Sequence, residues 1–124
     1  IVDTLASKGY RLVLATNPLF PRVGTLKRMR WVNLFEDDFA CVTTYEDFSY
    51  SKPNLGYYRE IVDRLELDPA RCLMVGNDVG EDMVVLEMGM KVYLITDCLI
   101  NPHNTPLSHF RHGSLKTFAT EILS

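Results

Sequence analysis

The stretch CLMVGNDVGEDM, residues 72–83, runs from an apolar segment into a glycine and then into three acids. Residues 71–76 have the length and composition of a buried strand that ends at Gly76. Asp78 and Glu81 stand at the spacing of a helix N-cap and the glutamate that reaches back to it, so capping explains both acids. Capping explains Asp82 only weakly. A metal or phosphate site is the alternative explanation for the whole stretch.

Strand and helix patterns alternate outward from this stretch along most of the chain. Apolar runs predict strands at residues 11–16, 40–44, 71–76 and 91–96. The clearest helix pattern, at residues 54–67, places its apolar side chains on one stripe. The other helices are predicted at residues 1–8, 21–32, 79–88 and 115–123. This alternation indicates an α/β fold with a parallel sheet that carries helices on both faces.

Composition and charge exclude several classes of partner. The chain has 124 residues, of which 47% are hydrophobic and 23% charged, as in an ordinary globular domain. A net charge of −3 provides no electrostatic attraction for nucleic acid or for an anionic membrane surface. No apolar run reaches the length of a membrane span, and no stretch has a signal-peptide pattern. We therefore expect neither nucleic acid nor a membrane as a partner.

Cysteine usage indicates the redox compartment. The chain has three cysteines, and Cys41 and Cys72 lie inside apolar runs. An odd count at such positions favours buried free thiols over disulfides or metal ligands. We therefore expect a reducing compartment, the cytoplasm.

Polar residues follow each predicted strand at its carboxyl end. Ligands of open parallel sheets bind beyond these ends, so the side chains there are candidates for a common site. They comprise a hydroxyl, a lysine and several carboxylates, in the segments Thr16-Asn17, Ser51-Lys52, Asn77-Asp78 and Asp97. A hydroxyl and an ammonium suit phosphate oxygens, and carboxylates suit Mg²⁺. The pattern therefore predicts a site for a phosphate dianion with a divalent cation.

Three segments resemble known motifs in their known order. LVLATN (12–17), SKPNLGYYREIVDRL (51–65) and MVGNDVGEDM (74–83) are similar to the second, third and fourth motifs of the haloacid dehalogenase (HAD) superfamily. Most members of that superfamily are Mg²⁺-dependent phosphatases. The resemblance extends to about Thr96 and implies a three-layer, Rossmann-like core. It also implies a small phosphorylated substrate.

The resemblance assigns a role to each matching residue. Thr16 and Lys52 would be catalytic, with the Thr16 hydroxyl, the Asn17 backbone and the Lys52 ammonium binding the phosphoryl group. Asp78 would bind Mg²⁺ directly. Asp82, one turn later on the same helix face, would be a second ligand or an outer anchor.

The first motif of the family has no counterpart in the sequence. That motif is an apolar strand ending in Asp-x-Asp, whose first aspartate is the nucleophile and whose second is the acid/base. IVDT (1–4) is the only candidate near the start, but the helical pattern of residues 1–8 runs through it. We therefore expect an incomplete core that is inactive by itself. Because residues 18–51 are too few for a large cap domain, any cap would also lie outside the sequence.

The absent motif has a structural consequence. In the family its strand lies between the strands that correspond to residues 11–16 and 71–76. We therefore expect these two strands not to pair. The segment that carries the first motif, a second copy of the chain by strand exchange, or a rearranged strand pairing would close the space between them.

Two other functions use similar residues. A receiver-like signalling domain also gathers acids, a threonine and a lysine around Mg²⁺, but its Lys-Pro pair follows the acids, whereas Lys52-Pro53 precedes them. A non-catalytic HAD relative that acts as a binding or regulatory module remains the alternative.

Two further groups of residues are assigned to ordinary structural roles. The histidines His103, His109 and His112 are predicted to be exposed in a loop, with a zinc site as the alternative. Trp31, with Phe35 and Phe39, is predicted to pack in the core, with a partner surface as the alternative.

Overall fold

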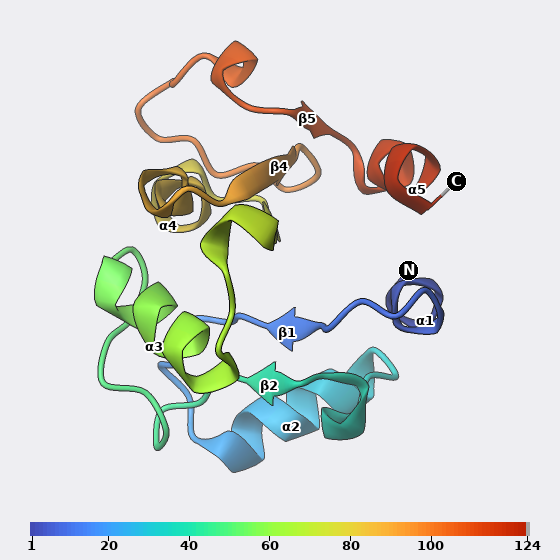
Figure 1. The fold of residues 1–124 in the computed structure, drawn as a ribbon, viewed down its shortest axis with the longest axis vertical. Helices are drawn as coiled ribbons and strands as arrows, with labels where there is room; N and C mark the ends of the chain where they lie inside the picture. Colours follow the sequence, from blue (N-terminus) through green and yellow to red (C-terminus); the bar gives the residue numbers. More distant parts are fainter. Residues whose placement is uncertain (124) are drawn as a thin grey trace. The chain divides into compact units, whose positions relative to one another are not determined.

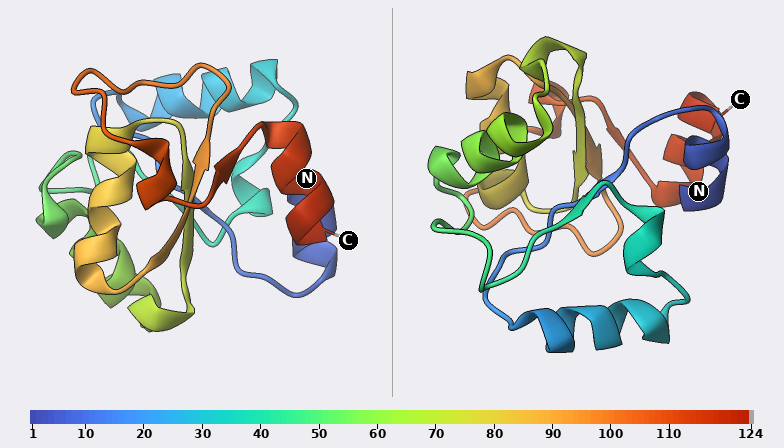
Figure 2. Two further views of the ribbon diagram at one scale, coloured as in Figure 1. Left: turned by 90° about the horizontal axis from the view of Figure 1, so that it is seen from above. Right: turned by 60° about the horizontal axis from the view of Figure 1, so that its bottom comes forward.

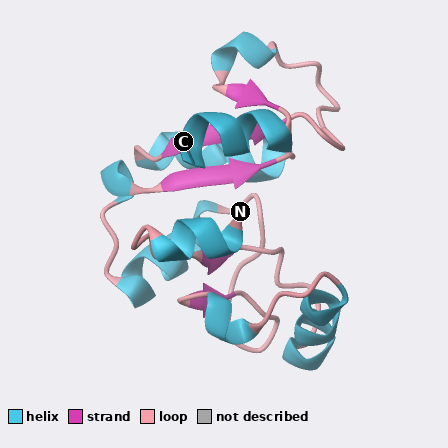
Figure 3. Cartoon of the chain, turned by 90° about the vertical axis from the view of Figure 1, so that its right-hand side faces the viewer, coloured by secondary structure: helices cyan, strands magenta, loops and turns pink. Residues whose placement is uncertain are grey.

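The computed structural model describes residues 1–123 and divides into two compact units, Ile1–Ile61 and Val62–Ser124. No helix within the described residues combines the length and hydropathy that a membrane crossing requires. Helices accompany the strands in both units (Figure 3).

The first unit contains a two-stranded parallel sheet. Its strands β1 (Val13–Leu14) and β2 (Cys41–Val42) pair in parallel, with Val13 opposite Cys41 and Leu14 opposite Val42. Helix α2 lies close to this sheet (Figure 1). The helices of this unit are α1 (Val2–Ser7), α2 (Arg22–Trp31), the 3-10 helix η1 (Glu36–Asp38) and most of α3 (Leu55–Leu65).

The second unit contains a three-stranded sheet in the order β3-β4-β5, with both pairs parallel (Figure 2). Its strands are β3 (Leu73–Gly76), β4 (Lys91–Ile95) and β5 (His112–Gly113). Its helices are η2 (Pro69–Arg71), α4 (Val79–Asp82), η3 (Met83–Met88), η4 (Leu107–His109) and α5 (Leu115–Leu123). β4 is the central strand, and residues 92–95 are buried.

The predicted helix at residues 79–88 forms in two pieces. One α-helical turn, α4, continues directly as the 3-10 helix η3. Gly89 ends it in the left-handed conformation, at φ +84°, which glycine adopts without steric cost. The predicted stop at Gly89 is therefore confirmed, whereas the regular helix is not.

The buried faces of α3 and α5 form the cores of the two units. Tyr57, Tyr58 and Ile61 of α3 are buried, and the rings of Tyr57 and Tyr58 meet edge to face with centroids 4.8 Å apart. In the second unit Tyr93 of β4 meets Phe118 of α5 edge to face at 5.0 Å. Both pairs have geometries that aromatic rings prefer.

The prediction that Trp31 and Phe35 pack in the core is wrong. Trp31 is 73% exposed and Phe35 51% exposed. Phe39 is half-buried. For Trp31 the reason lies in the phase of α2. This helix buries Thr25 and Met29, which stand one turn apart, and Trp31 is about 200° around the helix from Met29.

The cysteines are free, but less buried than predicted. Cys41 and Cys72 are half-buried and Cys98 is exposed. Burial, and then the charge of Asp68, raise the pKa of the Cys72 thiol.

Strands β1 and β3 belong to the sheets of different units. Within the described residues β1 pairs only with β2, and β3 only with β4. β3 exposes alternate apolar side chains, with Leu73 42% and Val75 37% exposed. An apolar edge strand of this kind is a surface on which another strand readily pairs.

Candidate functional site

In the first unit, the segments after β1 and β2 are joined by a hydrogen bond. The backbone N–H of Lys52 donates to Asn17 Oδ1 at 3.0 Å. Thr16 precedes Asn17 directly in the chain. The structure therefore brings together the three residues of this unit that the sequence assigned to phosphate binding.

A buried hydroxyl pair holds the backbone at Thr16. The carbonyl of Thr16 accepts hydrogen bonds from the Tyr57 hydroxyl, at 2.9 Å, and from the Thr43 hydroxyl. The side chains of Thr43 and Tyr57 are fully buried, and their oxygens lie 2.9 Å apart. The Thr16 hydroxyl in turn donates to the Thr43 carbonyl at 3.3 Å. Because buried polar groups are costly to leave unpaired, this network fixes the position of Thr16.

In the second unit, the acids sit where β3 turns into α4. Asp78 is the N-cap, and its Oδ1 accepts from the backbone N–H groups of Gly80 and Glu81, both at 3.0 Å. This confirms the capping role predicted for Asp78. The segment is also tied to the loop after β4, because Asn77 Nδ2 donates to the carbonyl of Cys98 at 2.8 Å.

Asp82 is buried behind this turn. It is 4% exposed, and its Oδ2 accepts from the backbone N–H of Asp78 at 3.2 Å. Asp82, one residue beyond the glutamate that the capping pattern singled out, therefore reaches back to the N-cap. Asp82 also lies directly on Gly76, where a Cβ atom would come within 2.7 Å of the Asp82 Cβ. The glycine leaves room for the buried acid.

Replacing Gly76 by alanine is expected to destabilise the protein by about 1–3 kcal/mol. The new methyl group would displace the Asp82 carboxylate from the Asp78 N–H. The control is Gly80→Ala, because the nearest atom to a Cβ there is Asp78 Oδ1 at 3.6 Å. Urea unfolding of the two variants measures the difference, and equal midpoints would show that Asp82 does not depend on the glycine.

Asp78 and Asp82 are the candidate metal ligands of the second unit, and a magnesium ion held by them would be shared with a phosphate. Asp78 and Asp82 offer hard carboxylate oxygens, the donor type that Mg²⁺ prefers. Within residues 1–123 no group of three or more His, Cys, Asp or Glu side chains is placed to hold a metal ion. Mg²⁺ is commonly held by one or two carboxylates together with substrate phosphates, so a pair of acids is a suitable donor set.

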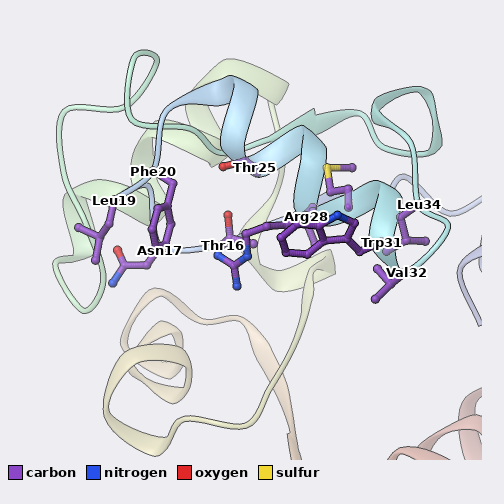
Figure 4. Close-up of a pocket in the computed structure, with 11 residues that line it drawn as sticks. Thr16, Asn17, Leu19, Phe20, Thr25, Arg28, Trp31, Val32 and Leu34 are labelled. Atoms are coloured by element: carbon purple, nitrogen blue, oxygen red, sulfur yellow. The ribbon is translucent and has the colours of Figure 1, made fainter.

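A cavity of about 590 Å³ opens in the first unit beside Thr16 and Asn17 (Figure 4). Arg28 of α2 reaches across it, and its guanidinium carbon lies 5.1 Å from the centroid of the Phe20 ring. Sequence reasoning missed Arg28, because its neighbours in the sequence do not distinguish it from the other basic residues of α2. The lining residues are Leu14, Thr16, Asn17, Leu19, Phe20, Thr25, Arg28, Met29, Trp31, Val32 and Leu34.

The three histidines His103, His109 and His112 are exposed, as predicted. They do not all lie in a loop, because His109 belongs to η4 and His112 to β5. The ring Nδ1 of His112 lies 2.9 Å from the carbonyl of Phe110.

Comparison with known proteins gives one family model and several relatives. A model described as haloacid dehalogenase-like hydrolase matches residues 1–89. A curated relative, glyceraldehyde 3-phosphate phosphatase from Methanothermobacter thermautotrophicus, is 32% identical over 96 residues. That match covers 73% of the chain, and the chain spans 39% of the relative's length.

Solved structures show the same fold. An HAD phosphatase from Thermococcus onnurineus superposes with a TM-score of 0.74 at 23% identity, covering 96% of the chain and 53% of the other protein. An HAD-hydrolase from Bacillus subtilis, solved bound to magnesium, superposes with a TM-score of 0.71 at 19% identity, covering 95% and 52%. At these identities the likeness shows the Rossmann-like α/β fold that the sequence predicts.

Proposed function

Because the chain belongs to the haloacid dehalogenase-like hydrolase family, we propose that the complete protein is a Mg²⁺-dependent phosphatase of small phosphorylated substrates. The relatives named above include phosphatases. Free thiols at all three cysteines support a cytoplasmic location for it.

The observation that carries the proposal is the pair of acids at the end of β3. The Asp82 carboxylate, which is 4% exposed, accepts a hydrogen bond from the backbone N–H of Asp78, just after the carboxyl end of the parallel strand β3. Burying an acid is costly, so such an arrangement favours a functional site over ordinary capping. In the proposal Asp78 binds the metal ion and Asp82 positions Asp78.

The residues of the first unit would bind the phosphoryl group. The Asn17–Lys52 hydrogen bond supports this assignment, because it holds the two segments at one place. The Thr16 hydroxyl and the Asn17 N–H would donate to phosphoryl oxygens, and the Lys52 ammonium would balance their charge. The Thr16 hydroxyl must then turn away from the Thr43 carbonyl to which it donates here.

The nucleophile would come from a segment outside residues 1–124. An aspartate carboxylate there would attack phosphorus, and the alcohol would leave with a proton from an acid. Water would then hydrolyse the acyl phosphate and release phosphate. Bound Mg²⁺ would offset the negative charge that develops on the phosphoryl oxygens.

The same segment would complete the sheet. β1 and β3 each have one paired edge within the described residues, and β3 exposes apolar side chains. A strand placed between them would pair with both and would bring the two sets of site residues to one rim. A second copy of the chain, by strand exchange, is the other way to pair these edges.

A non-catalytic binding or regulatory module is the second candidate. Only the segment that would carry the first motif distinguishes such a module from a phosphatase. Such a module would bind Mg²⁺ and phosphate without turnover by the complete protein.

The test is the metal dependence of hydrolysis by the complete protein. Chelation of Mg²⁺ and Asp78→Ala are each expected to abolish phosphomonoester turnover, and Asp82→Asn to weaken Mg²⁺ affinity by about 10- to 100-fold. Asp63→Ala, on the exposed face of α3, is the matched control and should leave turnover unchanged. Turnover that persists without metal, or in Asp78→Ala, would refute the proposal. Mg²⁺ binding without turnover would favour the second candidate.

A further inference from the structure

The cavity beside Thr16 has two chemically different ends (Figure 4). Thr16, Asn17 and Arg28 provide hydrogen-bonding groups and one positive charge, and the apolar side chains of Leu19 and Phe20 lie beside Asn17. Trp31, Val32 and Leu34 provide an apolar wall where α2 ends. A ligand that fits both ends carries an anionic group and an apolar group.

Size and charge both suit a small ligand. The cavity volume of about 590 Å³ lies within the range of ~300–1,000 Å³ that small-molecule sites span. Arg28 is held over the Phe20 ring at 5.1 Å, a cation–π geometry that orients the guanidinium without neutralising its charge. An anion in this cavity would therefore meet a positioned cation.

Two side chains of the apolar wall are largely exposed to solvent. Trp31 is 73% exposed and Val32 67% exposed. An aromatic or branched apolar group placed against them would remove this surface from water. Only ligands that carry such a group gain this favourable contribution to their binding free energy.

We propose that this cavity binds the leaving group of the substrate and selects phosphomonoesters of aromatic or branched-alkyl alcohols. The inference rests on the proposed function, because Thr16 and Asn17 at the polar end are the proposed phosphate-binding residues. Arg28 positions the substrate from α2, and Trp31 is the main contact of the apolar group.

The test uses two non-hydrolysable phosphonates that differ only in their apolar group. Benzylphosphonate and methylphosphonate are titrated calorimetrically into the complete protein with Mg²⁺. Benzylphosphonate is expected to bind about 10- to 100-fold more tightly, because its ring is buried against the apolar wall. Benzylphosphonate should change the fluorescence emission of Trp31. This emission is obtained by subtracting the emission of the Trp31→Phe variant from that of the unsubstituted protein.

Variants separate the two ends of the cavity. Trp31→Ala is expected to reduce the ratio of the two affinities about tenfold, and Arg28→Gln to weaken both ligands. The control is Val23→Ala, since Val23 is 77% exposed on the same helix but does not line the cavity, and it should keep the ratio. Circular dichroism verifies that each variant folds.

The outcomes distinguish the inference from the function on which it rests. Equal affinity for the two phosphonates would overturn the inference and leave the phosphate site standing. A preference that survives Trp31→Ala would also overturn it, because the ring would then bind elsewhere. Binding of neither phosphonate would overturn the proposed phosphate site and the inference together.

Discussion

Replacing Lys52 by alanine in the complete protein is expected to lower kcat/KM for phosphomonoester hydrolysis by about 100- to 1,000-fold. The physical reason is charge. A phosphoryl group in transfer is strongly anionic, and a positioned ammonium stabilises that charge far better than water does. The Lys52 backbone is held by Asn17 Oδ1, so the variant removes the cation without breaking that hydrogen bond.

The control for this prediction is Lys116→Ala. Lys116 is an exposed lysine on α5, and its loss should change kcat/KM less than twofold, a bound of about 0.4 kcal/mol. Steady-state kinetics with a generic aryl phosphate measures both variants. A Lys52→Ala enzyme within tenfold of the unsubstituted protein would remove Lys52 from the catalytic assignment.

The second large effect concerns residues 1–124 produced alone. This chain is expected to show no phosphatase turnover above that of its own Asp78→Ala variant. The remaining groups would bind phosphate and metal, but without a nucleophilic carboxylate they provide no covalent path. Phosphate release over several hours, with Mg²⁺ present, measures the rate.

Mixing the chain with the proposed nucleophile-bearing segment is the positive arm of that experiment. Turnover should return, because the segment would supply both the nucleophile and the strand that pairs with β1 and β3. A copy of the segment with its nucleophilic aspartate changed to asparagine is the matched control. Mg²⁺-dependent turnover by residues 1–124 alone, abolished by Asp78→Ala, would contradict the absence of the nucleophile.

Local patterns predicted most of the elements of the fold. The apolar runs at residues 71–76 and 91–96 became β3 and β4, and the amphipathic stripe at 54–67 became α3. These elements depend on residues that are close in sequence, and the spacing of apolar residues along the chain is a direct sign of them. β5 was missed because it is two residues long and forms only by pairing with β4.

Parts of the site depend on contacts between distant residues, and these were not predictable. Strand-end placement made Thr16, Lys52 and Asp78 candidates. The hydroxyls of Thr43 and Tyr57, however, support Thr16 from 27 and 41 residues away along the chain. A threonine at the end of a strand and a tyrosine in a helix carry no local sign of such a role. The exposure of Trp31 was likewise missed. Which side of α2 is buried depends on its packing against the sheet, and the sequence of the helix alone does not reveal that packing.

The central claim is that phosphate-binding and metal-binding residues meet at one site. The distance between Lys52 Nζ and the nearest Asp78 carboxylate oxygen tests it most directly, measured in a crystal structure of the complete protein with Mg²⁺ and phosphate. The account predicts a separation of about 4–6 Å, the range over which charges interact strongly. A separation beyond roughly 12 Å, about one Debye length in 0.1 M salt, would contradict it.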